Sequence, residues 1–411
     1  MSDIAEPHPS GRLNKTLSYY GAFIGLGLIL GSLGPTIPGL AELTGSTLDA
    51  LSTIFVAKSA GYLTGALFGG RLFDRYPGNP LLAIMLALMA IGMALVPLSI
   101  TITLLAAVLF FIGFGEGALD AGGNTLLVWL YPTGLGPWMN GLHFFFGVGA
   151  FISPLIVAHV LSSGGSISEV YWILAALLVP LTIYVGVLPS PTIAHHASEQ
   201  QTSLKEHRLT IVLVGGLLFA AVGAEVGYGN WLYTYALKRD LATTRTAAEL
   251  TSAYWAAFTV GRLAGIPLAA RTTPNRILIL CFAGIVAASL GILYRPDSQW
   301  VLWGGTIAAG ISVAPMFATI ISLAEARMPI SGRATGWFFV GSSTGGMSIP
   351  WVIGQLFETQ GTAWTFYVVL ADVFVGLVVL VIFNRSVQSF PRPVPPKSPD
   401  VGGRRESSVA H

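Results

Sequence analysis

The chain has 411 residues, of which 53% are hydrophobic and only 10% are charged, and its formal net charge is +2 at pH 7. Ordinary globular domains carry about 25% charged residues, so this composition excludes a water-soluble enzyme, a disordered chain and a nucleic-acid binder. The single cysteine, Cys281, excludes a disulfide framework and a thiolate metal cluster, and we expect no metal and no cofactor. What remains is a polytopic helical protein of the lipid bilayer.

Twelve apolar stretches are long enough to cross a membrane as helices, which takes about 20 mostly apolar residues each. They are 15–38, 51–73, 80–99, 102–128, 136–160, 169–188, 209–237, 247–269, 276–294, 299–324, 334–356 and 364–384. The stretches are too long for membrane β-strands and lack the alternating polarity of such strands. We therefore predict an all-α integral membrane protein with twelve transmembrane helices.

The basic residues predict how the helices are oriented. If the N-terminus is cytoplasmic, 15 of the 21 Lys and Arg residues fall in cytoplasmic segments, 4 fall in outer loops and 2 lie inside spans. Cytoplasmic loops of membrane proteins carry an excess of Lys and Arg. We therefore expect a multi-pass protein of the plasma membrane with both termini in the cytoplasm.

A polar interval separates the first six spans from the last six, and the two groups echo each other. Gly61-Tyr-Leu-Thr-Gly65 recurs 200 residues later as Gly261-Arg-Leu-Ala-Gly265. Two similar halves are typical of secondary transporters, whose substrate site lies near the membrane midplane between the halves. The predicted organisation is an N-terminal half (1–188), a cytoplasmic linker (189–208), a C-terminal half (209–385) and a disordered cytoplasmic tail (386–411).

The span at 102–128 carries two acids, although a charge at the bilayer centre costs at least about 2.5 kcal/mol. Glu116, Asp120 and Asn124 are spaced i, i+4, i+8 and therefore share one helical face. We interpret the acids as candidates for coupling to an ion and Asn124 as a substrate-binding residue. A structural ion pair or a hydrogen-bonded neutral acid is the alternative.

The span at 209–237 holds a second polar group, formed by Glu225, Tyr228, Asn230 and Trp231. Carboxyl, amide and indole groups together suit a sugar, because sugar hydroxyls bind polar groups and the apolar face of the ring stacks on an aromatic. We predict that these four residues bind substrate. The alternative for the aromatic residues is an interfacial belt.

Three further residues concern the depth of the site. Asp120, His143 and Arg262 each lie about seven or eight residues from the inner end of their span, which at about 1.5 Å per residue is one level. We therefore expect Arg262 to pair with Asp120 across the halves, directly or through His143. A packed interface histidine is the alternative for His143. Lys58, seven residues into its span, is expected to reach back to the membrane interface.

Four stretches resemble a known family. They are GLGLILGSLGPTIPGL (25–40), LDAGGNTLL (119–127), NGLHFFFGVGAFISPLI (140–156) and GAEVGYGNWLYTYAL (223–237). They resemble the major facilitator superfamily, and within it the fucose–proton symporter group and its sodium-dependent glucose transporter branch. The resemblance implies that Asp120 is the coupling carboxylate, and it matches Glu225 and the Gly261-Arg262 pair to family positions. Leu33–Thr36 offers no second acid, which favours the glucose branch over fucose.

The loop after residue 69 resembles the superfamily's loop signature. Gly70, Asp74 and Arg75 match it, whereas Pro77 is an insertion and Asn79-Pro80 replaces the expected basic pair. The resemblance implies a latch that breaks as the protein opens inward. Ordinary positive-inside charge with a turn is the alternative.

The resulting expectation is a monomeric secondary transporter that moves a hexose such as glucose by alternating access, coupled to H⁺ or Na⁺. The chain has no G-x-x-x-x-G-K-[ST] run, so no ATPase motif supplies the driving force. A proton-coupled efflux antiporter for drugs or metabolites is the first alternative. A membrane sensor that binds without turnover is the second.

Overall fold

The computed structural model describes residues 9–191, 206–328, 330 and 332–387, and in these residues all regular structure is helical. The first half contains α1 (Pro9–Thr44), α2 (Leu48–Leu51), α3 (Thr53–Phe73), α4 (Gly78–Leu95), η1 (Val96–Leu98), α5 (Ile102–Leu130), α6 (Leu135–Ser162) and α7 (Ile167–Gly186). The second half contains α8 (Arg208–Lys238), α9 (Thr244–Arg271), α10 (Pro274–Tyr294), α11 (Gln299–Val313), α12 (Met316–Glu325), α13 (Gly332–Gln360) and α14 (Trp364–Val387). The predicted all-α class is confirmed.

Twelve long helical segments coincide with the twelve predicted spans, because α2 continues into α3, α4 into η1 and α11 into α12. Within the described ranges, ten segments are both long and apolar enough to cross a membrane. The other two, α9 and α13, have 28 and 29 residues but are more polar. Both contribute polar side chains to a central cavity: Arg262 from α9, and Ser342 and Ser343 among others from α13.

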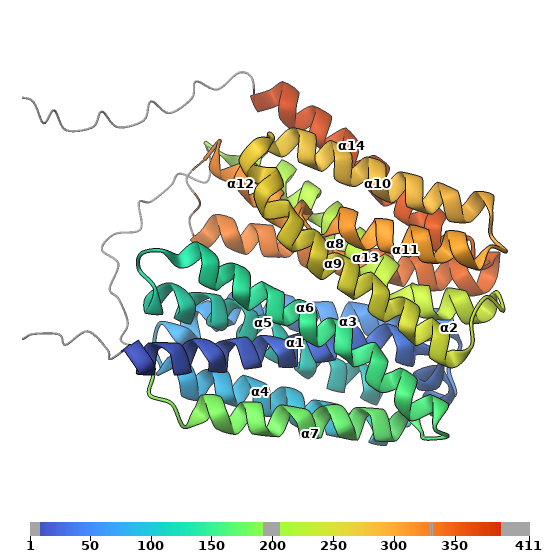
Figure 1. Ribbon diagram of the computed structural model, residues 1–411, viewed down its shortest axis with the longest axis horizontal. Helices are drawn as coiled ribbons and strands as arrows, with labels where there is room; N and C mark the ends of the chain where they lie inside the picture. The colour runs from blue at the N-terminus through green and yellow to red at the C-terminus, as the bar shows by residue number, and fades with distance from the viewer. Residues whose placement is uncertain (1–8, 192–205, 329, 331, 388–411) are drawn as a thin grey trace, which may run out of the picture.

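The long helices run roughly along one axis and form two groups, α1–α7 and α8–α14, that lie against each other (Figure 1). The described chain begins and ends at the same end of the bundle, on the left of Figure 1, which we call the terminal end. We call the opposite end the far end. Most of the predicted linker (189–208) and nearly all of the predicted tail (386–411) lie outside the described residues, so these domain boundaries stay predictions.

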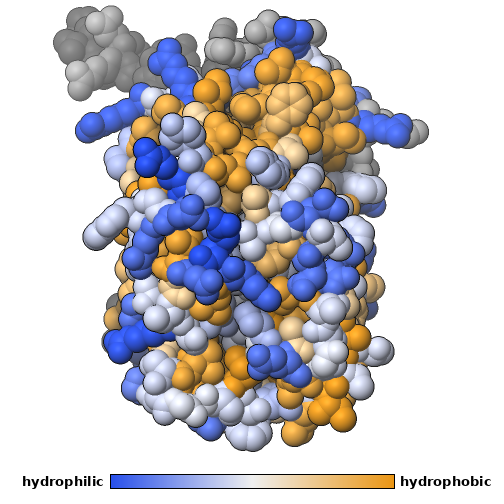
Figure 2. Space-filling view, turned by 90° about the vertical axis from the view of Figure 1, so that its right-hand side faces the viewer, coloured by the Kyte–Doolittle hydropathy of each residue, from blue (hydrophilic) through white to orange (hydrophobic). Residues whose placement is uncertain are grey.

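Ser and Thr side chains cap four of the helices that begin at the far end. The hydroxyl oxygens of Thr101, Ser166, Thr243 and Ser298 each accept a hydrogen bond from a backbone N–H in the first turn of α5, α7, α9 and α11. Such N-caps satisfy donors that have no partner inside the helix. The turns that contain them are polar, and Figure 2 shows hydrophilic side chains across this end of the molecule with hydrophobic ones between and beside them.

Close glycine contacts join α3 and α5. A Cβ atom at Gly113 would lie 2.1 Å from the carbonyl oxygen of Lys58, and one at Gly117 would lie 2.0 Å from that of Tyr62. Two glycines of α3 at the same four-residue spacing, Gly61 and Gly65, approach α5 in the same way. Small residues at this spacing let two membrane helices pack backbone to backbone. The register of α3 against α5 is therefore determined by these contacts.

Close contacts join the two halves toward the far end. The Gln355 amide of α13 donates to the carbonyl oxygen of Asp49, at 2.7 Å, and to Ser52 Oγ, at 3.2 Å. Gly34 of α1 lies against Asn230 of α8, where an added Cβ would come within 2.9 Å of the Asn230 Cα. These contacts close the far end of the interface between the halves.

Candidate functional site

A cavity of about 1200 Å³ lies between the two halves and is lined by residues of α1, α3, α5, α6, α8, α9, α12 and α13. At the terminal end its wall includes the exposed residues Arg71, Asp74 and Arg333. The far end is closed by the contacts of Gln355. In this conformation the cavity is therefore accessible only from the terminal end.

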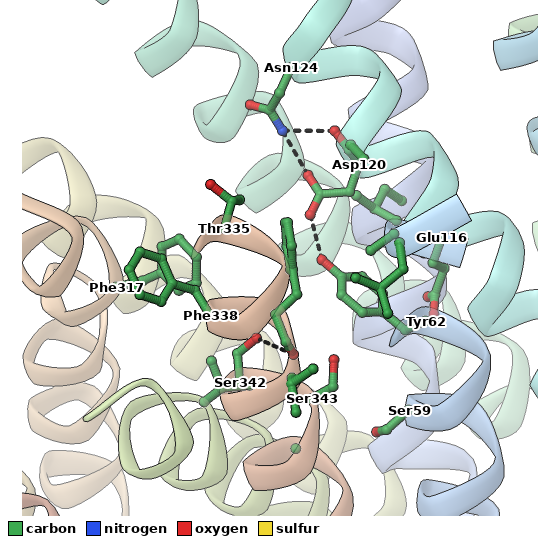
Figure 3. A pocket seen from close by; sticks show the side chains of 18 of the residues that line it. Ser59, Tyr62, Glu116, Asp120, Asn124, Phe317, Thr335, Phe338, Ser342 and Ser343 are labelled. Atoms are coloured by element: carbon green, nitrogen blue, oxygen red, sulfur yellow. Dashed lines mark hydrogen bonds between the residues drawn. The ribbon is translucent and has the colours of Figure 1, made fainter. Parts of the chain in front are cut away.

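Two acids of α5 face this cavity, and each has a partner on α3. Lys58 Nζ lies 3.0 Å from Glu116 Oε1. One turn further along both helices, Tyr62 Oη donates a hydrogen bond of 2.5 Å to Asp120 Oδ2 (Figure 3). The spacing of i, i+4 on α3 thus matches the spacing of i, i+4 on α5. The glycine contacts explain this match, because they keep the two helices in register.

Asn124 completes the group around Asp120. Its Nδ2 donates to the Asp120 backbone oxygen at 2.8 Å and to Asp120 Oδ1 at 3.0 Å (Figure 3). Asp120 therefore accepts hydrogen bonds from Tyr62 on one carboxylate oxygen and from Asn124 on the other. The predicted face of Glu116, Asp120 and Asn124 is present, and all three side chains line the cavity.

Lys58 corrects one expectation. Its side chain does not reach back to the membrane interface: the residue is 8% exposed, and its partner Glu116 is 3% exposed. A buried lysine without a counter-charge would be strongly disfavoured, and the carboxylate of Glu116 supplies that charge. Of the two acids of α5, Glu116 therefore forms a structural ion pair, which was the alternative to a coupling role.

Arg262 of α9 lines the cavity but makes no ion pair with Asp120 among the described residues. Its guanidinium carbon lies 4.5 Å from the ring centroid of Phe258 and 5.6 Å from that of Phe146. The expected direct pairing is thus wrong for this conformation, because aromatic faces hold the cation. Arg262 still interacts electrostatically with Asp120 from one half and Glu225 from the other.

His143 of α6 also lines the cavity, with its ring edge-on to Phe23 at a centroid distance of 5.8 Å. No hydrogen bond from His143 to Asp120 or Arg262 is present in the described structure, so it does not bridge them here. It interacts electrostatically with Arg262. His143 therefore belongs to the cavity wall, on the same side of α6 as Phe146, whose ring packs against Arg262.

The four α8 residues predicted to bind substrate divide into two that line the cavity and two that do not. Glu225 and Asn230 line the cavity together with Val222 and Val226. The Asn230 amide donates 2.8 Å to the Val226 carbonyl oxygen. Residues at i, i+3, i+4 and i+8 share one side of a helix of 3.6 residues per turn, so these four form a single face of α8.

Tyr228 and Trp231 are absent from the cavity wall, which corrects the prediction that they bind substrate. At about 100° per residue, Trp231 lies on nearly the opposite side of α8 from the cavity face. Its indole Nε1 donates to the Pro350 carbonyl oxygen at 2.9 Å. The Tyr228 ring stacks on Tyr254 with centroids 5.5 Å apart. Both aromatic residues hold helices of the second half together.

Several cavity residues were not predicted from sequence. Tyr62 has the clearest contact, and its spacing from Lys58 was the signal that could have identified it. Ser342 and Ser343 of α13 also line the wall, and Figure 3 shows them close to the cavity. The Ser343 hydroxyl has no hydrogen-bond partner in the part of the chain that the structure describes. A ligand in the cavity could supply one.

The loop motif lies at the mouth of the cavity, where Gly70 and Asp74 are part of the wall. Asp74 is the C-cap of α3, and its backbone N–H donates to the Gly70 carbonyl oxygen at 3.1 Å. Arg71 lies over the Phe68 ring at 6.0 Å. Neither Asp74 nor Arg75 makes an ion pair within the described ranges. The latch therefore stays a prediction.

Comparisons with known proteins agree with this architecture. The family model of the Major Facilitator Superfamily matches residues 17–338. The chain is 31% identical over 379 residues to the sodium-dependent glucose transporter 1 of Danio rerio, and the match covers 83% of this chain and 64% of that protein. It is 29% identical over 374 residues to the sodium-dependent glucose transporter 1A of Mus musculus, covering 82% of this chain and 88% of that protein.

Among solved structures, a mutant of the nucleoside transporter NupG has a similar fold, with a TM-score of 0.73 and 16% sequence identity over 91% of this chain and 99% of that chain. At this identity the likeness concerns the fold alone. The family model, by contrast, matches most of the chain. The chain therefore belongs to the major facilitator superfamily, and it is a membrane transporter rather than an enzyme.

Proposed function

We propose that the protein carries a hexose-type sugar across the plasma membrane by alternating access. The observation that supports this most is the distribution of polar groups in the cavity. Each half contributes a carboxyl and an amide from one helix: Asp120 and Asn124 on α5, and Glu225 and Asn230 on α8. A sugar presents hydroxyls around its ring, and acceptors and donors on two opposite walls suit such a ligand.

Aromatic and apolar residues supply the remainder of the wall, among them Phe23, Phe146 and Phe338. Ligand sites are mostly apolar with a few placed polar groups, and typically measure about 300–1,000 Å³. The cavity of about 1200 Å³ exceeds this range slightly, which suits a chamber that is open at one end. The sodium-dependent glucose transporters at 31% and 29% identity support a sugar as the substrate class.

The positive-inside pattern supports an assignment of the terminal end to the cytoplasm. On that assignment the conformation described is inward-facing. The far-end contacts between the halves would then form the outer closure, and they would have to separate for substrate to enter from outside. The loop residues Gly70, Asp74 and Arg75 would form the inner latch, which is open in this state.

An ion gradient would drive the transport through a carboxylate of the cavity. Asp120 is the best placed, because its two oxygens receive separate hydrogen bonds from Tyr62 and Asn124 and it interacts with Arg262 of the other half. The coupling ion would be H⁺ or Na⁺. Loss of the Asp120 charge would uncouple transport from the gradient.

Uptake of labelled sugars into proteoliposomes tests the proposal. We expect the wild type to show counterflow of a hexose. Counterflow by Glu225→Gln should be at least about tenfold weaker, since a hydrogen bond to a charged group contributes about 1.5–3 kcal/mol. Glu358→Gln should show normal counterflow. Glu358 is a matched control because it is exposed near the end of α13, away from the cavity. Proton release driven by a drug, with no hexose exchange, would instead establish the efflux antiporter.

A further inference from the structure

The ion pair of Lys58 with Glu116 has a consequence for the ion that the protein accepts. Both side chains line the cavity, and both are almost fully buried. Lys58 Nζ lies 3.0 Å from Glu116 Oε1, and Lys58 is the one residue of the described chain that pairs with this carboxylate as an ion pair. The ammonium therefore occupies the place where a mobile cation would bind Glu116.

The backbone holds this arrangement in position. A Cβ at Gly113 would lie 2.1 Å from the Lys58 carbonyl oxygen, so the α3 backbone at Lys58 is in direct contact with α5 one turn before Glu116. Both residues belong to the first half and would move together when the halves rock. A tethered ammonium has a high effective concentration at its partner, so a dissolved cation competes poorly for Glu116.

The neighbouring carboxylate offers no alternative Na⁺ site as it stands. Hard metal cations are bound by several oxygen acceptors. The groups on Asp120 are instead donors: the Tyr62 hydroxyl on one oxygen and the Asn124 amide nitrogen on the other. Arg262 adds a further positive charge that interacts with Asp120. Both acids of α5 thus face donors and cations, and the third carboxyl of the cavity, Glu225, interacts with the same Arg262 cation.

We propose that Lys58 determines the ion specificity of this transporter: its ammonium is a built-in cation that fills Glu116 and excludes Na⁺ from the cavity. The statement rests on the proposed function only in taking ion-coupled transport as the activity that Na⁺ would affect. Glu116 would then be a charge partner of Lys58 rather than a coupling acid. This chain would work without Na⁺, and in this it would differ from the similar transporters that are named sodium-dependent.

The test measures Na⁺ binding directly and needs no sugar. Purified wild type is melted in rising NaCl with choline chloride at constant ionic strength, and we expect no saturable rise in melting temperature. Lys58→Gln frees Glu116, so we expect a saturable Na⁺-dependent rise that disappears in the double variant Lys58→Gln, Glu116→Gln. Lys58→Arg retains a cation and should behave like the wild type. Lys238→Gln, at the end of α8, controls for the loss of one positive charge.

Uptake gives the second readout. Replacing choline with Na⁺ should leave wild-type hexose uptake unchanged and should stimulate Lys58→Gln by about fivefold or more, the scale of a coupling between two sites. Saturable stabilisation of the wild type by Na⁺, or no response of folded Lys58→Gln, would overturn the proposal. If Lys58→Gln does not fold, saturable stabilisation of the wild type by Na⁺ is still enough to overturn the proposal. Absence of any hexose uptake with the expected melting pattern would refute the sugar assignment and leave Lys58 in its role.

Discussion

Tyr62 of α3 donates a hydrogen bond of 2.5 Å to Asp120 of α5, one turn beyond the ion pair that Lys58 makes with Glu116. Two acids on one helix thus meet two partners on its neighbour at equal spacing. The partners differ in kind, a neutral hydroxyl for Asp120 and a cation for Glu116. The two acids are therefore placed for different tasks, although they look equivalent in the sequence.

Removal of the Tyr62 hydroxyl should impair transport. Tyr62→Phe keeps the ring but deletes the donor to Asp120, and a hydrogen bond to a charged group contributes about 1.5–3 kcal/mol. We expect the initial rate of hexose uptake to fall by at least about tenfold. Tyr184→Phe is the control, because its hydroxyl donates to the Asn14 carbonyl oxygen at an exposed site. Equal rates for the two variants would show that Tyr62 does not position Asp120.

The outer closure should weaken when Gln355 is shortened. Gln355→Ala removes hydrogen bonds to the Asp49 carbonyl oxygen and to Ser52 Oγ, each worth about 1 kcal/mol. We expect outward-facing molecules to become about tenfold or more abundant relative to inward-facing ones. A maleimide added from the far side should then label Asn230→Cys faster.

The labelling experiment has an internal control in the chain. Cys281 is buried and should contribute little background. Gln360→Ala, at the exposed end of the same helix, removes the same side chain without touching the first half. Faster labelling in both variants would mean that Gln355 has no special part in the closure.

Gly117 should not accept a side chain. An added Cβ would lie 2.0 Å from the Tyr62 carbonyl oxygen, so α3 and α5 would have to separate. Overpacking of this kind costs about 1–3 kcal/mol, and we expect Gly117→Ala to lower the melting temperature and to reduce uptake through the displaced Tyr62. Gly304→Ala meets nothing within 4 Å and should leave both unchanged. Unchanged melting of Gly117→Ala would contradict the close contact.

Trp231 and Asn230 are sequence neighbours that should differ in their mutant effects. Trp231→Phe leaves the Pro350 carbonyl without its donor, which should destabilise the fold by about 1–3 kcal/mol while the KM for sugar stays close to that of the wild type. Asn230→Ala removes an amide from the cavity wall and should raise KM with little change in melting. The reverse pattern would restore Trp231 to the substrate site.

The sequence alone predicted the helices and the family, because both depend on local and additive features. Twelve apolar runs of sufficient length have to become helices in a bilayer, since their backbone groups find no other partners there. The spacing of Glu116, Asp120 and Asn124 likewise predicted a shared face, which the structure contains. Of the four α8 residues predicted together to bind substrate, Glu225 and Asn230 line the cavity, whereas Tyr228 and Trp231 do not.

What tertiary structure decided is which side of each helix meets which neighbour. Trp231 is one residue from Asn230 in the chain, yet it points away from the cavity that Asn230 lines. Lys58 looked like a residue near the interface, yet the glycine contacts of α5 bring it to Glu116. Arg262 lies against aromatic rings rather than on Asp120. Hydrophobicity is a property of each residue and can be read along the chain. These pairings depend instead on the register and rotation of helices that are distant in sequence, and close packing alone determines that register and rotation.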